Sequence, residues 1–168
     1  YFDVMALHDS GITNVVASLG TALSSNQITL LSRSTDSKKI LLNFDSDNAG
    51  IRAANRAISE VENLAIQGQL DLRVLQLPSG KDPDEFLKDN SPSEYEALAA
   101  KSPLWMDWQI DQSLKDLDLN KSDQFQEAVS TLVTLLGKLP QTAIRTHYLQ
   151  KVAQRLSGGQ GRFALQLE

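Results

Sequence analysis

The feature that most constrains the fold is a largely apolar run followed directly by two aspartates. Residues 39–44 read KILLNF, and Asp45, Ser46 and Asp47 come next. A run of this length and composition is typical of a strand buried on both faces of a parallel sheet. Because ligands of such sheets bind beyond the carboxyl ends of the strands, the two aspartates stand where a functional site is expected.

Strand-like and helical segments alternate through the first half of the chain. Short strand-like runs cover residues 14–19, 39–44 and 70–77, while helical spacing covers residues 24–33 and the segment that follows Asp47. Asp47 or its neighbour is expected to cap that long helix. The alternation predicts a parallel sheet with helices on its faces.

The second half has no strand-like run. Residues 104–114, 122–139 and 141–156 each show helical spacing. The expected fold class is therefore α/β, a parallel sheet flanked by helices, followed by an all-α helical subdomain. We place the domain boundary so that residues 1–96 form the first domain and residues 97–168 form the second.

Composition narrows the classes of function. The 168 residues include no cysteine, carry a formal net charge of −5 and contain no apolar run long enough to cross a membrane. Disulfides, thiol catalysis and cysteine-based zinc sites are excluded within the chain, and a cytoplasmic protein with no membrane partner is expected. Acidic side chains outnumber basic ones in residues 1–95. This excess is either a solvated surface or a cluster of carboxylates around metal ions.

A second acidic pair repeats the arrangement after the next strand. Asp82, Pro83 and Asp84 follow the strand-like run and its Pro-Ser-Gly turn. Neighbouring parallel strands lie about 5 Å apart, so the two pairs would share one pocket whose oxygen atoms suit Mg²⁺. The ordinary interpretation stays open beside this one: Asp47 as a helix N-cap and Asp84 as a favourable charge in a first helical turn.

Three other known motifs fit these residues less well than a metal site does. An EF-hand loop is excluded, because Ala49 and Arg56 stand where oxygen ligands are required. A phosphatase with an aspartate nucleophile usually continues with Gly-Thr, whereas Asn-Ala-Gly follows here, so this alternative is weak but open. A receiver-domain phosphoacceptor is disfavoured because Lys81 lies directly beside the second acidic motif.

The other chemistry-bearing side chains are few. His8 and His147 lie far apart and lack the spacing of metal ligands. Trp105 and Trp108 lie three residues apart on an expected helix. We interpret these tryptophans as core residues, with a base-stacking pair as the alternative.

Five segments share their order and spacing with a known family. They read YFDVMAL at the start, VASLGTAL at residues 16–23, FDSDNAGIRAANR at 44–56, GKDPDEF at 80–86 and RTHYLQKVAQRL at 145–156. Together they resemble the TOPRIM segment and the final helices of the polymerase core of bacterial DnaG-type primases. The aspartate pair followed by Ala-Gly is common to TOPRIM proteins, including topoisomerases and some nucleases, whereas the SLGTA and DPD elements favour primase.

The resemblance implies a TOPRIM-like fold and specific roles for individual side chains. It implies two bound ions, Mg²⁺ or Mn²⁺, that support nucleotidyl transfer. The catalytic, metal-binding acids would be Asp45, Asp47, Asp82 and Asp84. Asp3 would be a further metal-binding acid, and the nucleotide or phosphate contacts would be Gly20, Thr21 and Arg56.

The function implied by the resemblance is RNA primer synthesis for DNA replication. The partners would be a single-stranded DNA template, NTPs, the RNA primer and, through a C-terminal domain outside this chain, the replicative helicase; zinc would belong only to an upstream domain outside it. In the family, the opening motif has an essential Glu just before the position that corresponds to Tyr1. The first strand of the family's fold also precedes this position. We therefore expect the first strand to be missing and this segment alone to be inactive.

Two other functions stay open. One is a different TOPRIM enzyme, a topoisomerase or a nuclease, although neither Tyr95 nor Tyr148 has a recognisable context for the nucleophile that a topoisomerase needs. The other is a TOPRIM module that binds a partner and does no chemistry. Binding of Mg²⁺ or Mn²⁺ would separate this module from the enzymes.

Overall fold

The computed structural model describes residues 1–18, 23–45 and 47–157. The chain divides into two compact units, Tyr1–Trp105 and Met106–Glu168, which are treated separately below. This division falls later than the boundary between residues 96 and 97 expected from the sequence. The reason is helix α5 (Pro92–Lys101), whose buried Tyr95 belongs to the core of the first unit.

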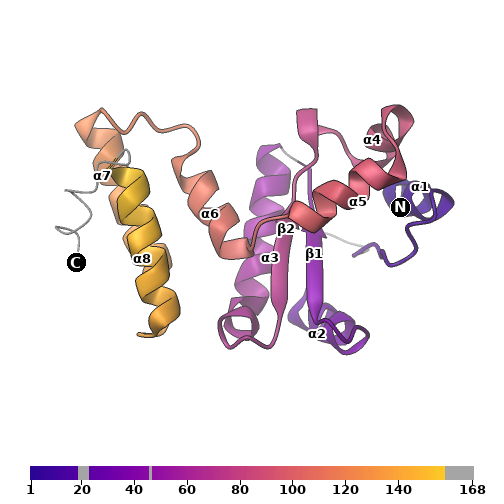
Figure 1. The fold of residues 1–168 in the computed structure, drawn as a ribbon, viewed down its shortest axis with the longest axis horizontal. Coiled ribbons are helices and arrows are strands. Elements are labelled where there is room, and N and C mark those ends of the chain that lie inside the picture. The colour runs from indigo at the N-terminus through magenta and orange to yellow at the C-terminus, as the bar shows by residue number, and fades with distance from the viewer. Residues whose placement is uncertain (19–22, 46, 158–168) are drawn as a thin grey trace. The chain divides into compact units, whose positions relative to one another are not determined.

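The centre of the first unit is a parallel pair of strands. Strand β1 (Lys39–Asn43) pairs with β2 (Asp71–Leu75), in a register that runs from Lys39 opposite Asp71 to Asn43 opposite Leu75 (Figure 1). The parallel sheet expected from the sequence is confirmed. Because the strands are parallel and in register, both end at the same edge of the sheet.

Helix α3 (Asn48–Ile66) connects the two strands and packs against β2 (Figure 1). Its apolar residues recur every three or four positions, and Ala54, Ile58 and Val61 are buried as this spacing predicts. The shorter α2 (Ser25–Arg33) contacts both α3 and β1. It begins with a capping box in which Ser24 accepts a hydrogen bond from the backbone of Gln27.

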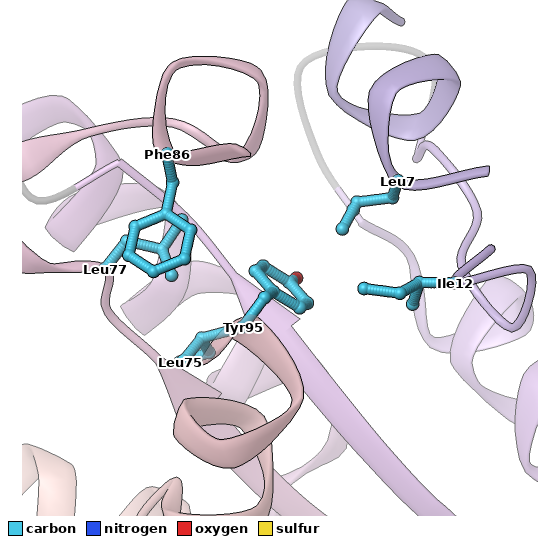
Figure 2. Packing of buried hydrophobic residues seen from close by; sticks show 6 residues of the cluster. All are labelled: Leu7, Ile12, Leu75, Leu77, Phe86 and Tyr95. Carbon is cyan, nitrogen blue, oxygen red and sulfur yellow. The ribbon is translucent and has the colours of Figure 1, made fainter. Parts of the chain in front are cut away.

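Three helices and a turn surround the edge where the strands end. They are α1 (Phe2–Asp9), the 3₁₀ turn η1 (Pro78–Gly80), α4 (Pro83–Asp89) and α5. Figure 2 shows the apolar cluster between them, in which side chains from α1, β2, α4 and α5 face one another. We call this the edge cluster; its members are Leu7, Ile12, Leu75, Leu77, Phe86 and Tyr95.

One expected strand is not present. Residues 14–18 of the expected run 14–19 form no strand, and Leu19 lies outside the described residues. The side chain of Val16 is 66% exposed, so the run does not bury its apolar residues as a strand of the sheet would. Apolar content alone, without a neighbouring strand to pair with, did not produce a strand here.

The second unit is helical in its described part, as expected. It comprises most of α6 (Trp105–Leu114), together with α7 (Ser122–Gly137) and α8 (Ala143–Leu156). Helices α7 and α8 pack together, and α8 is joined to α6 by ion pairs of Lys151 with Asp107, at 2.7 Å, and of Arg155 with Asp111.

Both tryptophans at the start of α6 are buried. Trp105 and Trp108 are 5% and 3% exposed, which favours core residues over base-stacking platforms because stacking needs an accessible ring face. Among the described residues, no helix combines the length and the apolar character needed to span a membrane.

Candidate active site

The acidic side chains singled out in the sequence lie where the strands end or where helices begin. Asp45 comes two residues after the end of β1, and Asp47 is the N-cap of α3. Asp82 is the N-cap of α4, and Asp84 lies in the first turn of that helix. Asp3 lies in the first turn of α1, not directly after a strand. Helix N-termini therefore carry most of these acids.

The two capping aspartates are each held by one backbone amide. The N–H of Gly50 donates to Oδ1 of Asp47 at 2.7 Å, and the N–H of Glu85 donates to Oδ1 of Asp82 at 2.7 Å. The N-cap interpretation of Asp47 is thus confirmed. It does not compete with a ligand role, because a carboxylate has a second oxygen and further lone pairs on the first.

Asp45 lies in the field of four other carboxylates. Burial raises the pKa of Asp45 above its ordinary value, and the carboxylates of Asp47, Asp3, Asp82 and Glu85 raise it further. No cation among the described residues contributes to this shift. Negative charge therefore gathers at the end of β1, which is the electrostatic condition that favours binding of a divalent cation. Lys88 lies in the field of two of these carboxylates, Asp82 and Glu85.

Gly50 holds the first turn of α3 against the backbone of Asp45. A Cβ at this position would lie 2.0 Å from the carbonyl oxygen of Asp45, far inside van der Waals contact. Only a residue without a side chain allows so close an approach. Gly50 therefore determines how closely the two acids of the Asp45–Asp47 segment sit beside α3.

Asp84 differs from the other predicted acids because its carboxylate is hydrogen-bonded to a lysine. Its Oδ2 accepts a hydrogen bond from Nζ of Lys88 at 2.7 Å, and this bond raises the pKa of Lys88. Asp84 does not appear among the groups that raise the pKa of Asp45, whereas the adjacent Glu85 does. Sequence reasoning missed Glu85, although its position directly after the Asp-Pro-Asp motif is a signal that could have indicated it.

The donor set fits a hydrated cation better than a closed metal cage. Among the described residues, no three His, Cys, Asp or Glu side chains lie close enough together to enclose a metal ion. Mg²⁺ usually keeps several water ligands and is held by one or two carboxylates together with substrate phosphates. Acids that share one field without converging on one point match this mode of binding.

Of the three residues predicted to contact phosphate, only Arg56 lies among the described residues. Gly20 and Thr21 lie outside the described residues. Arg56 lies on α3 with an exposed side chain, beyond the helical turn that Asp47 caps. Its role in phosphate binding stays a prediction.

The two tyrosines considered from the sequence, Tyr95 and Tyr148, are poorly suited to act as nucleophiles. Tyr95 is 4% exposed, and burial raises the pKa of its hydroxyl. Tyr148 is 7% exposed, and burial, assisted by Asp107, raises its pKa to about 12. A topoisomerase needs an accessible tyrosine hydroxyl that loses its proton readily, so neither residue supports that alternative.

Comparison with known proteins gives this arrangement a family. A family model described as Toprim-like matches residues 1–87. DNA primase of Synechococcus elongatus is 60% identical over 167 residues, which cover 99% of this chain and 24% of the relative. DNA primase of Synechocystis is 46% identical and covers 96% of this chain and 26% of the relative. A solved DnaG primase catalytic domain bound to ssDNA matches with a TM-score of 0.76 at 28% identity, over 94% of this chain and 49% of that one.

The chain belongs to the bacterial DnaG-type DNA primases. The resemblance drawn from the sequence motifs is thereby confirmed, as is the TOPRIM fold class. The chain spans about a quarter of the length of these two DNA primases.

The second unit of this DnaG-type chain matches a different family model. The model is described as the DnaB-helicase binding domain of primase and matches residues 106–161. From the sequence, helicase binding was expected of a domain outside this chain, whereas the matching segment lies within it. Helix spacing alone gave no reason to connect these helices with a helicase.

Proposed function

We propose that this chain supplies the metal-binding part of the polymerising site of a DNA primase, which makes short RNA primers on single-stranded DNA for replication. The observation that supports it most is the field of carboxylates around Asp45 at the edge where both strands end. Its position agrees with the rule that parallel sheets bind ligands beyond their carboxyl ends. The similarity to a DnaG catalytic domain solved with ssDNA supports the choice of template.

In the proposed reaction, the 3′ hydroxyl of one nucleotide attacks the α-phosphate of the next NTP and pyrophosphate leaves. Mg²⁺ or Mn²⁺, as two ions, would be held by Asp45, Asp47, Asp82 and Asp84, with Asp3 nearby. When bound, such ions stabilise negative charge on the attacking and leaving oxygens. The chain's own part is to orient these carboxylates, which α3 and α4 do for Asp47 and Asp82 through the backbone amides that hold them.

The metal assignment can be tested by crystallography. Crystals of the chain soaked in Mn²⁺ should show anomalous scattering beside Asp45, Asp47, Asp82 and Asp84. Scattering elsewhere, with none beside these carboxylates, would contradict the assignment. Binding of Mn²⁺ there would also disfavour the non-catalytic module, for which no metal is required.

The reaction itself needs an assay in the longer primase that contains this chain. Asp45→Asn should reduce primer synthesis from NTPs and Mg²⁺ on single-stranded DNA by two orders of magnitude or more, because removal of one pre-positioned charged group typically costs on the order of 10²–10³ in rate. Asp36→Asn, in the exposed turn before β1, is the matched control and should retain the activity. Equal activities in the two variants would argue against the proposed site.

A second proposal concerns the replicative helicase. We infer that the helices of the second unit contribute to helicase binding, because the helicase-binding family model covers residues 106–161. Deletion of this segment from the longer primase should weaken its binding to a DnaB-type helicase, measured by isothermal titration calorimetry. Unchanged affinity would place the contact outside this chain, as expected from the sequence. Any zinc would be bound by a domain outside this chain, because this chain contains no cysteine.

A further inference from the structure

A buried tyrosine lies against the end of the strand that leads to the acids. The Asn43 side-chain amide donates to the hydroxyl oxygen of Tyr95 at 3.3 Å, although the two residues are 52 positions apart in the chain. Asn43 is the last residue of β1 and lies two positions before Asp45. The hydrogen bond therefore ties α5 to the point at which the chain leaves the sheet for the acidic segment.

The ring of Tyr95 reaches a second element that carries an acid. It packs edge-on against the ring of Phe86, with centroids 6.3 Å apart and an interplanar angle of 62°. Phe86 belongs to α4, the helix that begins at Asp82. The edge cluster also includes Leu7 of α1, one helical turn after Asp3 (Figure 2).

We propose that Tyr95 is a positioning residue for the metal site: through its hydroxyl it holds the end of β1, and through its ring it holds α4, so that the acids of these elements keep their separation. The proposal rests on the proposed function, because it concerns the same metal-binding acids. Tyr95 acts through these elements and would itself touch no reacting atom. Helix α5, on which Tyr95 lies, contains none of the metal-binding acids predicted from the sequence.

Tyr95→Phe separates the two roles, since the ring stays and only the hydroxyl is lost. In the full chain, we expect this change to weaken Mn²⁺ binding about three- to tenfold, which corresponds to the loss of one side-chain hydrogen bond. Asn43→Leu should weaken it to a similar degree, because the same bond is lost. The double variant should bind Mn²⁺ no more weakly than the weaker single variant, because two changes that remove one shared interaction are not additive.

Tyr148→Phe is the matched control. Tyr148 is a similarly buried tyrosine on α8 in the other unit, so its variant loses a hydroxyl without touching the edge cluster. It should bind Mn²⁺ as the parent chain does. Melting temperatures in EDTA, measured for every variant, show whether a change in Mn²⁺ affinity merely follows a loss of folded protein.

The outcomes distinguish this inference from the function on which it rests. If the parent binds Mn²⁺ and Tyr95→Phe binds it equally well, Tyr95 is only a core residue and the inference is overturned. The inference is also overturned if the losses of Mn²⁺ affinity in the two single variants add up in the double variant, because the two side chains would then act through different contacts. If the parent chain binds no Mn²⁺ at all, the proposed metal site fails and the inference falls with it.

Discussion

Asp45 ionises next to four other carboxylates, and this has a measurable cost for folding. Burial and these neighbours raise its pKa in the folded chain above the ordinary value of 3.8. The folded chain thus holds the proton more tightly than the unfolded chain does. As the pH rises from 3.8 through the raised pKa, ionisation of Asp45 therefore destabilises the fold, and at neutral pH the full effect is present.

Asp45→Asn and Asp82→Asn should each raise the melting temperature in EDTA at pH 7 and abolish Mn²⁺ binding. Asparagine removes the charge, and at position 82 it can still cap α4. The gain for Asp45→Asn should disappear at pH 3, where the parent carboxyl is protonated in both states. Thermal denaturation at the two pH values checks this, with Asp36→Asn as the control. A lower melting temperature in EDTA would show that the acids are structural.

Gly50→Ala should destabilise the chain by about 1–3 kcal/mol, the usual cost of forcing extra atoms into a packed site. Its Cβ would displace the backbone of Asp45, so Mn²⁺ affinity should fall as well. Gly137→Ala, at the end of α7 with nothing within 4 Å of the added Cβ, is the control and should stabilise by about 0.5–1 kcal/mol. Urea denaturation measures both. Equal effects would mean that the Asp45 backbone yields without strain.

At the scale of elements, the N-cap of α3 has both a structural and a chemical task, and substitution separates them. Asp47→Asn should keep the bond to the Gly50 amide and the stability, but lose Mn²⁺ affinity. Asp47→Ala should lose both and cost about 1 kcal/mol in the free energy of unfolding. Urea denaturation and Mn²⁺ titration check this pair. Full Mn²⁺ affinity in Asp47→Asn would leave capping as the only role of Asp47.

Elements with a strong apolar periodicity, or with clear caps or turns at their ends, could be predicted from the sequence. Helix α3 has a buried apolar face and an N-cap, and β2 lies between a glycine-containing turn and η1. Helix α1 could not, because its eight residues have no side-chain cap and bury only Leu7. Tertiary contact with α4 decides its structure, and no local pattern encodes that contact.

The candidate site was predictable in part for the same reason. Asp45, Asp47 and Asp82 follow recognisable strands, so the order of the elements predicted that these acids lie at the same edge of the sheet. The ion pair of Asp84 with Lys88 and the hydrogen bond of Tyr95 with Asn43 depend on where side chains point after folding. The second of these joins residues on different elements, which periodicity alone does not place together.

At the scale of the whole molecule, this chain alone should make no primers. It spans about a quarter of its relatives, and its net charge of −5 repels the phosphates of a template. The chain and the longer primase should be compared for RNA synthesis on single-stranded DNA with NTPs and Mg²⁺. Weak Mn²⁺ binding should survive in the chain. Robust synthesis by the chain alone would mean that it contains a template-binding surface of its own.

The acids around Asp45 come from three stretches of sequence: the start of α1, the segment after β1 and the start of α4. This arrangement has a consequence during translation. Asp3 leaves the ribosome first and Glu85 last, so the carboxylates cannot be gathered until α4 has emerged and docked on α1. A nascent chain stalled before α4 should therefore carry separate aspartates with little affinity for divalent cations. Acquisition of the ion would therefore report that α4 has docked on α1, and tighter binding would follow once α5 has added Tyr95.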